Sequence, residues 1–505
     1  MIEQHNSLGE KFLKKGFWLY LFSFIIAPIG YIIKIIISHD LNVDEIGIIY
    51  GVMSLMVLLS SFNDLGMTES LNKFLPEYIT KKEYSKAKSI IFYSLILQGI
   101  SLFFIFLFFF FGADFIGNNY FKDSSSIDVI KSFAFYFLAI NFFQIFTTFF
   151  ISIQNTFLQK FIEFFRMFLV LGLTFLLFFY DFGNIYTYSL TWVISVYLGI
   201  ILAFNIFYFK YYKKYLKNEK IIFEKKFFIN ILKYALLVFL ANQAGTILSQ
   251  MDMQMVIYFL GNHDAGYYTN YLSIIGIPFV VIGPIMGLLF PVFSELIAKN
   301  EHKKIILIKE VFQKSFLGFI IALSILFFVF SQNISTILFG EKFLQSGLIL
   351  KYSILFIGFN FLLQLNFNIL ASIGQVRERL NIILIAIVFN FFANIILIKY
   401  IGVSGAALAT GLGWILIWFL SELNLKDFKS KFDYKYYLKN IFVFILIGIF
   451  IKIYILEIFA NIDLRINQFF TLSIISLLYF SVFIIINKND FKYFFGEIKK
   501  VRNKN

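Results

Sequence analysis

The stretch Asp44-Glu45-Ile46-Gly47-Ile48-Ile49-Tyr50 is the first of two similar motifs in this chain. The second motif, about 219 residues later, is His263-Asp264-Ala265-Gly266-Tyr267-Tyr268-Thr269. Each opens an apolar segment, which leads to Phe74-Leu75-Pro76-Glu77 in the first copy and to Phe290-Pro291-Val292-Phe293-Ser294-Glu295 in the second. In a membrane protein, a repeat of this length predicts two similar helix bundles with a substrate path between them. We therefore expect a carrier.

The composition indicates a membrane protein with many spans. Of the 505 residues, 60% are hydrophobic and 15% are charged, whereas soluble domains carry about 25% charged residues. The net charge of +14 is then explained by membrane topology, and no nucleic-acid partner is expected. Cysteine is absent and the four histidines are scattered, so neither a disulfide nor a metal site is predicted.

Fourteen apolar segments are long enough to cross a bilayer as helices, which takes about 20 residues each. The predicted spans are 16–38, 46–67, 88–112, 127–152, 160–180, 185–209, 233–259, 265–292, 311–331, 346–373, 380–399, 402–422, 440–458 and 466–487. Because span thirteen is the shortest, twelve spans stay open as an alternative.

The distribution of lysine and arginine predicts the orientation of the chain. With the N-terminus inside, most basic residues fall in cytoplasmic segments, and the outer loops are acidic or neutral. We therefore expect both termini in the cytoplasm. The predicted parts are an N-lobe with spans one to six (1–209), a basic linker (210–232), a C-lobe with spans seven to twelve (233–423), and a second basic linker with two further spans and a basic tail (424–505).

Polar residues follow the same repeat as the opening motif. The matched pairs are Lys131 with Lys351, Asn141 with Asn360, Gln144 with Gln364, and Ser152 with Ser372. The same offset places Lys34 of span one beside Asp252 of span seven. Since each lobe holds an even number of spans, the lobes form a parallel repeat.

Three segments carry a resemblance to a known family. They are Leu65-Gly66-Met67 with Leu71-Asn72-Lys73-Phe74-Leu75-Pro76-Glu77-Tyr78, Ala265-Gly266-Tyr267-Tyr268 through Leu289-Phe290-Pro291 and Ser294-Glu295-Leu296, and Gly402-Val403-Ser404-Gly405-Ala406-Ala407-Leu408-Ala409-Thr410. At these span numbers they resemble the Wzx-type polysaccharide flippases of the multidrug/oligosaccharidyl-lipid/polysaccharide (MOP) superfamily.

The resemblance implies an all-α, MATE-like fold with two six-helix lobes, and a transporter rather than an enzyme. It implies that undecaprenyl-pyrophosphate-linked oligosaccharide is moved from the cytoplasmic to the outer leaflet of a bacterial inner membrane, for O-antigen or capsule synthesis. The implied partners are this substrate, membrane lipids, a polysaccharide polymerase and a chain-length regulator. No cofactor is implied, and coupling to H⁺ or Na⁺ is left open.

Charged residues inside spans are candidate functional residues, because a charge near the bilayer centre is costly without water or a partner. We expect Lys34, Lys131 and Lys351 to line a cationic cavity and contact the substrate diphosphate. The alternative for each is that it extends to the membrane surface. The other predicted cavity residues are Asp252, Asn242, Gln243 and Gln364. The polar run around Gln243 has buried helix–helix hydrogen bonding as its alternative.

Four more residues are candidates for a gate or for ion coupling. Asp64 and Glu69 bracket Gly66 at the inner end of span two, which favours a gate or a helix-end role. Glu163 and Arg166 are three positions apart in span five and can pair on one helix. Asp252 or Glu163 is the expected proton acceptor if a proton drives transport.

Three other functions remain open from the sequence. A lipid II flippase also handles a pyrophosphate-linked sugar, so its site chemistry would be similar. A MATE-type drug or cation antiporter needs an acidic residue inside the first lobe, where span one offers Lys34 instead. The third alternative is a scaffold for a glycan assembly complex that transports nothing.

Overall fold

The computed structural model describes residues 8–222, 224–430 and 434–450, together with positions 479, 481 and 484. All regular secondary structure in this described part is helical, as the pairing of backbone groups in lipid requires. Ten of its helices are long and apolar enough to cross a membrane. The predicted all-α membrane fold is therefore confirmed. The chain divides into two compact units, Met1–Thr269 and Asn270–Asn505.

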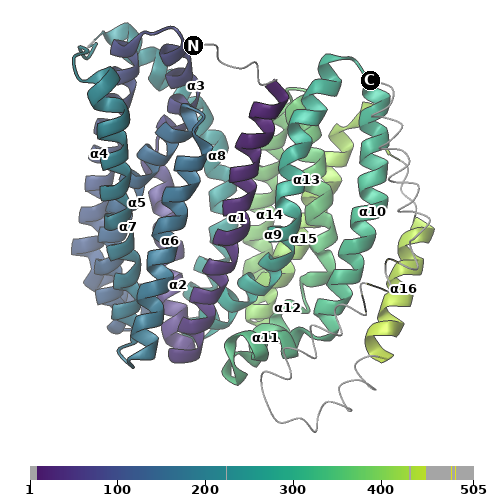
Figure 1. Ribbon diagram of the computed structural model, residues 1–505. Helices are drawn as coiled ribbons and strands as arrows, with labels where there is room; N and C mark the ends of the chain where they lie inside the picture. The colour runs from purple at the N-terminus through teal and green to yellow at the C-terminus, as the bar shows by residue number, and fades with distance from the viewer. Residues whose placement is uncertain are drawn as a thin grey trace. The chain divides into compact units, whose positions relative to one another are not determined.

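In the first unit, α1 packs along α6, and α5 lies against both α4 and α7 (Figure 1). The π-helix η3 continues directly from α7. The helices are α1 (Leu8–Asp40), α2 (Val43–Ser60), α3 (Met67–Thr80), α4 (Tyr84–Phe115), α5 (Ser125–Ser152), α6 (Thr156–Phe179), α7 (Ile185–Phe207), η3 (Tyr208–Leu216) and α8 (Lys225–Leu260).

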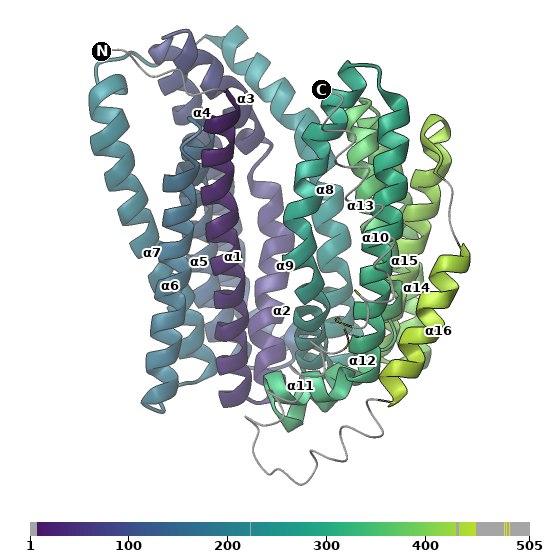
Figure 2. The ribbon, with the colours of Figure 1, turned by 45° about the vertical axis from the view of Figure 1, so that its right-hand side comes forward.

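In the second unit, α14 packs along α15, and α10 lies beside α16 (Figure 2). Its first helix, α9, begins in the first unit and continues past Asn270. The helices are α9 (Asn262–Ala298), α10 (His302–Val329), α11 (Ser331–Phe339), α12 (Leu344–Leu350), α13 (Ile357–Ser372), α14 (Val376–Ile401), α15 (Val403–Asn424) and α16 (Tyr434–Phe450).

The two copies of the repeated motif mark the starts of α2 and α9. At α2 the Asn42 side chain accepts from the Glu45 amide, and the Glu45 carboxylate accepts from the Asn42 amide, each at 2.9 Å. This reciprocal capping satisfies two amide groups that the first turn cannot pair internally. The starts of the two helices also touch, because the His263 ring lies 2.9 Å from the Asp44 carboxylate.

Two predicted spans have different bounds in the structure. Span two does not reach residue 67, because the chain turns at Leu65 and Gly66 (φ 46° and 77°) before α3 begins. A Cβ on Gly66 would lie 1.9 Å from the Ala235 carbonyl oxygen, so this turn needs glycine. Span ten is interrupted between α12 and α13, where the buried Ser353 hydroxyl is 2.8 Å from that of Tyr271 on α9.

The division by packing also differs from the predicted lobes. Helix α8 belongs to the first unit because its side chains bond to α2, and the boundary falls inside α9. The lobes at 1–209 and 233–423 therefore stay a prediction. So does the count of fourteen spans, since α16 covers the start of span thirteen while span fourteen, apart from single positions, lies outside the described residues.

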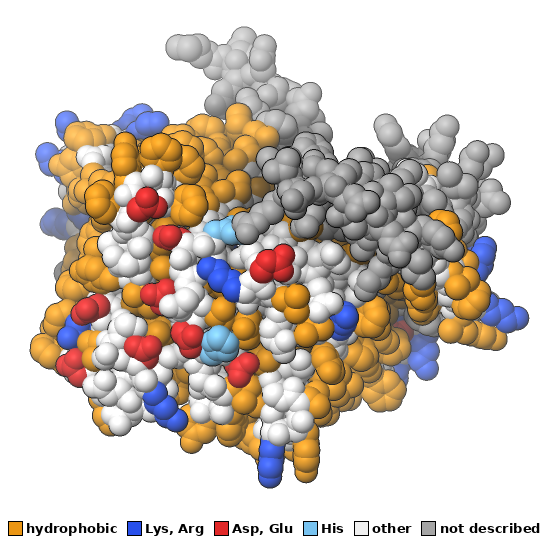
Figure 3. All heavy atoms as spheres, turned by 90° about the horizontal axis from the view of Figure 1, so that it is seen from below, with side chains coloured by type: hydrophobic (Ala, Val, Ile, Leu, Met, Phe, Trp, Pro, Cys, Tyr) orange, Lys and Arg blue, Asp and Glu red, His pale blue; other side chains and the backbone are white. Residues whose placement is uncertain are grey.

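Figure 3 looks onto the end of the molecule where α1 stops and α2 begins. Acidic side chains are spread over this face among apolar ones. Asp40 and Asp44 are exposed at the end of α1 and in the first turn of α2. This is the distribution expected of the predicted outer side.

Candidate functional site

Among the described residues of the first unit, Lys34 is one of the charged residues that are buried. It lies on α1 with only 8% of its surface exposed. Its Nζ donates to the Thr269 carbonyl oxygen (2.6 Å) and to the Thr269 hydroxyl (2.7 Å), and it lies 4.1 Å from the centroid of the Tyr50 ring. Within the described residues no carboxylate lies within ion-pair distance of this ammonium. The buried charge is thus held only by neutral groups.

Asp252, the predicted counterpart of Lys34, bonds to the same helix, α9, as Lys34 does. The side chain is buried on α8 and accepts a hydrogen bond from the Tyr268 hydroxyl at 3.2 Å. Since Tyr268 precedes Thr269, the lysine and the aspartate bind consecutive residues of one helix. The repeat offset thus matches two charged residues whose side chains bond to neighbouring positions of α9.

The polar run of α8 bonds mainly to α2. The Gln243 amide donates to the Ser61 carbonyl (2.9 Å), and the Ser54 hydroxyl donates to Gln250 Oε1 (2.8 Å). Gln254 in turn donates to Ser54 (2.9 Å). These contacts are the helix–helix hydrogen bonds of the alternative interpretation. Asn242 lies on α8, but its side chain is outside the described part.

Lys131 and Lys351 differ from Lys34 in their surroundings. Lys131 lies on α5, with its side chain 35% exposed, and its Nζ is 3.6 Å from the Asp114 carboxylate of α4. Lys351 caps the end of α12 at the interruption of span ten, where it is half-buried. Of the three predicted cavity lysines, only Lys34 is therefore buried.

Asp64 and Gln364 each bond to neighbours in their own unit. The Asp64 carboxylate accepts from the Thr68 amide (3.0 Å), the Thr68 hydroxyl (2.6 Å) and Gln98 on α4 (2.9 Å). It therefore has the helix-end role that was one of its two interpretations. Glu69 is half-buried on α3. On α13, Gln364 Nε2 donates to Asn360 Oδ1 at 2.6 Å, so the second-copy members of two repeat-matched pairs bond to each other.

Glu163 and Arg166 do not pair with each other. Glu163 accepts from Lys160 (2.7 Å) and from Gln159 (2.8 Å), both on its own helix α6. The Arg166 guanidinium lies 5.6 Å from the centroid of the Phe143 ring, and its Nε and Nη1 are buried without hydrogen-bond partners. The expected ion pair is replaced because Lys160 competes for the same carboxylate.

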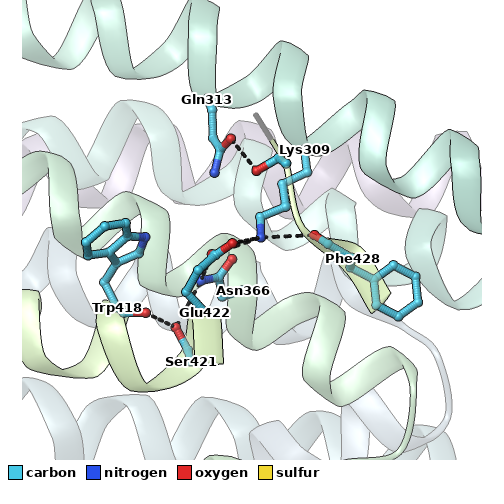
Figure 4. Close-up of polar contacts among 8 residues, drawn as sticks. Lys309, Gln313, Asn366, Trp418, Ser421, Glu422 and Phe428 are labelled. Carbon is cyan, nitrogen blue, oxygen red and sulfur yellow. Dashed lines mark hydrogen bonds and ion pairs between the residues drawn. The ribbon is translucent and has the colours of Figure 1, made fainter. Parts of the chain in front are cut away.

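The sequence analysis missed a buried ion pair in the second unit (Figure 4). The fully buried Lys309 of α10 lies 2.8 and 2.9 Å from the two carboxylate oxygens of Glu422 on α15. Asn366 of α13 donates to Glu422 (2.9 Å), and Lys309 also donates to the Phe428 carbonyl (3.2 Å). Lys309 and Glu422 both lie at the predicted ends of spans. Charged residues are common at such ends, so the sequence did not indicate that these two are buried.

The described residues contain no group of three or more His, Asp or Glu that could hold a metal ion. The first unit thus holds a buried ammonium on neutral ligands, and a buried carboxylate that bonds to the adjacent residue of α9. Such an ammonium can exchange its carbonyl and hydroxyl partners for an anion, because hydrogen bonds between charged groups are stronger.

Sequence comparisons relate the chain to a protein family and to other proteins. Residues 12–297 match the family described as polysaccharide biosynthesis protein. An uncharacterized membrane protein of Methanocaldococcus jannaschii is 29% identical over 504 residues, which cover 95% of each chain. The probable low-salt glycan biosynthesis flippase Agl15 of Haloferax volcanii is 28% identical over 201 residues, which cover 38% of this chain and 40% of that protein.

Solved structures show the same fold. The lipid II flippase MurJ in an inward closed conformation superposes with a TM-score of 0.71 at 16% identity, covering 92% of this chain and 98% of that one. An inward-facing multidrug resistance MATE family transporter of the MOP superfamily gives a TM-score of 0.60 at 15% identity, covering 78% and 92%. The predicted MATE-like fold is confirmed by these structures, and the family match agrees with the predicted resemblance to polysaccharide flippases.

Proposed function

The chain belongs to the polysaccharide biosynthesis protein family, and from this premise we propose that it is a flippase for a lipid-linked oligosaccharide. The substrate would be a polyprenyl diphosphate that carries the glycan repeat unit. The bacterial O-antigen and the undecaprenyl carrier of the sequence prediction are narrower than this proposal requires, since both curated relatives named above are archaeal.

Lys34 is the observation that carries the proposal. A diphosphate headgroup has to cross a layer in which charge is costly, and Lys34 offers a buried cation whose present partners are neutral. A phosphate oxygen would replace the Thr269 contacts at a gain, because both partners would then be charged. Lysine is a compact point charge on a flexible stem, which suits release as well as binding.

The proposed mechanism is alternating access. The headgroup enters a polar passage from the cytoplasmic side, is held by Lys34, and leaves on the outer side while the prenyl tail stays in lipid. Asp252 is the proposed site of ion coupling, because this buried carboxylate bonds to the residue next to the one that holds Lys34. The coupling ion would be a proton or sodium.

A transport assay in proteoliposomes tests the proposal. Wild-type protein should move a fluorescent polyprenyl diphosphate-linked oligosaccharide between leaflets, and Lys34→Gln should slow this by about tenfold or more, as loss of a charged hydrogen bond predicts. Lys34→Arg should keep part of the rate. Lys299→Gln, at an exposed lysine paired with Glu295, is the matched control.

The outcomes of this assay distinguish an error in the proposed function from an error in the role given to Lys34. If wild-type protein moves no lipid-linked glycan, the proposed function is wrong. If Lys34→Gln transports at the wild-type rate, the function stands and the role of Lys34 is wrong. The likeness to the lipid II flippase concerns the fold, and lipid II offered in the same assay would decide whether its headgroup is accepted.

A further inference from the structure

A cavity of about 310 Å³ lies in the first unit, away from Lys34. It is lined by the end of α3, the start of α4, the end of α5 and the π-helix η3, and it is open on one side. Its lining is mainly apolar and aromatic, and it includes Leu75, Ala87, Phe149, Tyr84, Tyr211 and Tyr215. This is the predicted cytoplasmic end of the unit.

Contacts with the neighbouring helices fix the walls of this cavity. The Tyr211 ring packs edge-on against Phe149, with centroids 5.3 Å apart, and its hydroxyl accepts from the Asn155 amide at 3.2 Å. Asn155 Oδ1 meanwhile accepts from the Leu158 amide at the start of α6 (3.1 Å). On another wall, the rings of Tyr84 and Tyr215 stack at 5.9 Å.

The π-helix that forms one wall is also tied down at its end. Lys88 of α4 donates to the carbonyls of Lys217 (3.3 Å) and Glu219 (2.8 Å), and the Ser85 hydroxyl donates to the Glu219 carboxylate (2.6 Å). A π-helix is rare and often marks a functional site. These bonds to α4 hold in place the wall that η3 forms.

Basic side chains stand beside this wall. Lys210, Lys213 and Lys214 are exposed on η3, and in the part of the chain that the structure describes none of them has an ion-pair partner. The Lys214 ammonium lies 5.1 Å from the centroid of the Tyr215 ring, which lines the cavity. Glu219, the acid nearest to this helix in sequence, is bonded to Ser85.

We propose that this cavity binds an anionic phospholipid of the surrounding membrane. The apolar and aromatic walls suit an acyl chain, and the lysines beside them suit a phosphate headgroup at the membrane surface. A glycan would need several polar groups to bind it, but both ends of the Asn155 amide are already engaged. The site is separate from the proposed transport site and does not depend on it.

Native mass spectrometry of the full chain in detergent tests the proposal, with phosphatidylglycerol and phosphatidylcholine added in turn. Wild-type protein should bind one phosphatidylglycerol tightly and phosphatidylcholine weakly. Lys213→Gln with Lys214→Gln should weaken phosphatidylglycerol binding about tenfold. Lys225→Gln with Lys226→Gln, at two exposed lysines that start α8, removes the same charge elsewhere and should leave binding unchanged.

A second variant tests the cavity itself. Ala87→Trp places a large side chain into the lining and should abolish phosphatidylglycerol binding. If that protein does not fold, Tyr215→Ala removes an exposed wall residue instead and should weaken binding. Three results would overturn the proposal: equal loss in both double-lysine variants, equal binding of the two phospholipids, or preferential binding of a polyprenyl phosphate that competes with phosphatidylglycerol.

Discussion

Gly47 and Gly266 each leave room for the backbone of the other's helix. A Cβ on Gly47 would lie 1.9 Å from the Asn262 carbonyl oxygen, and a Cβ on Gly266 would lie 2.0 Å from that of Val43. Each glycine thus contacts the residue four positions before the other. The contact is reciprocal, as at an interface between two related copies. This packing explains why both copies of the motif carry glycine here.

Alanine at either glycine should destabilise the protein. The added Cβ cannot be accommodated without moving a helix backbone, and such overpacking costs about 1–3 kcal/mol. We expect Gly47→Ala and Gly266→Ala to lower the melting temperature measured in detergent by intrinsic fluorescence. Gly172→Ala is the matched control, because its Cβ would meet nothing within 4 Å. An unchanged melting temperature for both test variants would contradict the reciprocal contact.

The contact between Asp44 and His263 should open during transport. These exposed side chains lie 2.9 Å apart at the starts of α2 and α9, at the predicted outer end. Because the chain has no native cysteine, Asp44→Cys with His263→Cys can be linked by a short bifunctional thiol reagent without other reactions. The linked protein should lose flipping in the proteoliposome assay.

The single cysteine variants, treated with the same reagent, serve as controls and should keep flipping. If the linked double variant transports as well as the unlinked one, the starts of α2 and α9 do not separate in the cycle. In that case the passage proposed for the headgroup must open elsewhere.

The sequence predicted the helical membrane fold because apolar length and the repeated motif are strong local signals. The motif at Asp44 and Glu45 marks a helix start through the Asn42 cap, and the repeat offset linked Lys34 to Asp252. The interruption near Ser353 escaped prediction, because the short polar stretch Lys351-Tyr352-Ser353 has apolar residues on both sides. What breaks the helix is a buried turn, and its bond to Tyr271 is visible only in three dimensions.

The sequence shows which charged residues are candidate functional residues more readily than it shows which groups they bond to. A lysine that precedes an apolar run, such as Lys309, is ordinarily a sign of topology. Its burial depends on Glu422, more than a hundred residues away. Arg166 was expected to bond to Glu163 because spacing on one helix allows it, but spacing cannot show that Lys160 takes the carboxylate.

Breaking the Lys309–Glu422 pair from one side should be strongly destabilising. Glu422→Gln leaves the Lys309 ammonium buried without a counter-charge, and such losses cost about 3–5 kcal/mol. We expect a large fall in melting temperature for Glu422→Gln. Lys309→Met combined with Glu422→Gln should recover much of it, because the uncompensated charge is gone.

The exposed pair of Lys81 and Glu77 on α3 provides the comparison. Lys81→Met should leave the melting temperature unchanged, since solvent screens exposed ion pairs. If Glu422→Gln were as mild as Lys81→Met, the buried pair would not hold α10 and α15 together. If the double variant were no better than Glu422→Gln, the loss would come from packing rather than from charge.

Lys34 and Lys131 should differ in transport although both are lysines within spans of the first unit. Lys131 is partly exposed and already faces Asp114 at 3.6 Å, so Lys131→Gln should leave the flipping rate within about twofold of wild type, as for a screened pair. Lys34→Gln should give the larger loss, because no solvent or carboxylate replaces its charge for the substrate. Both variants are compared at equal protein content in proteoliposomes. The contrary result would be an equal loss of flipping in Lys131→Gln and Lys34→Gln, with no effect of Asp114→Asn. Lys131 would then bind the headgroup directly, and burial would be the wrong criterion for ranking these lysines.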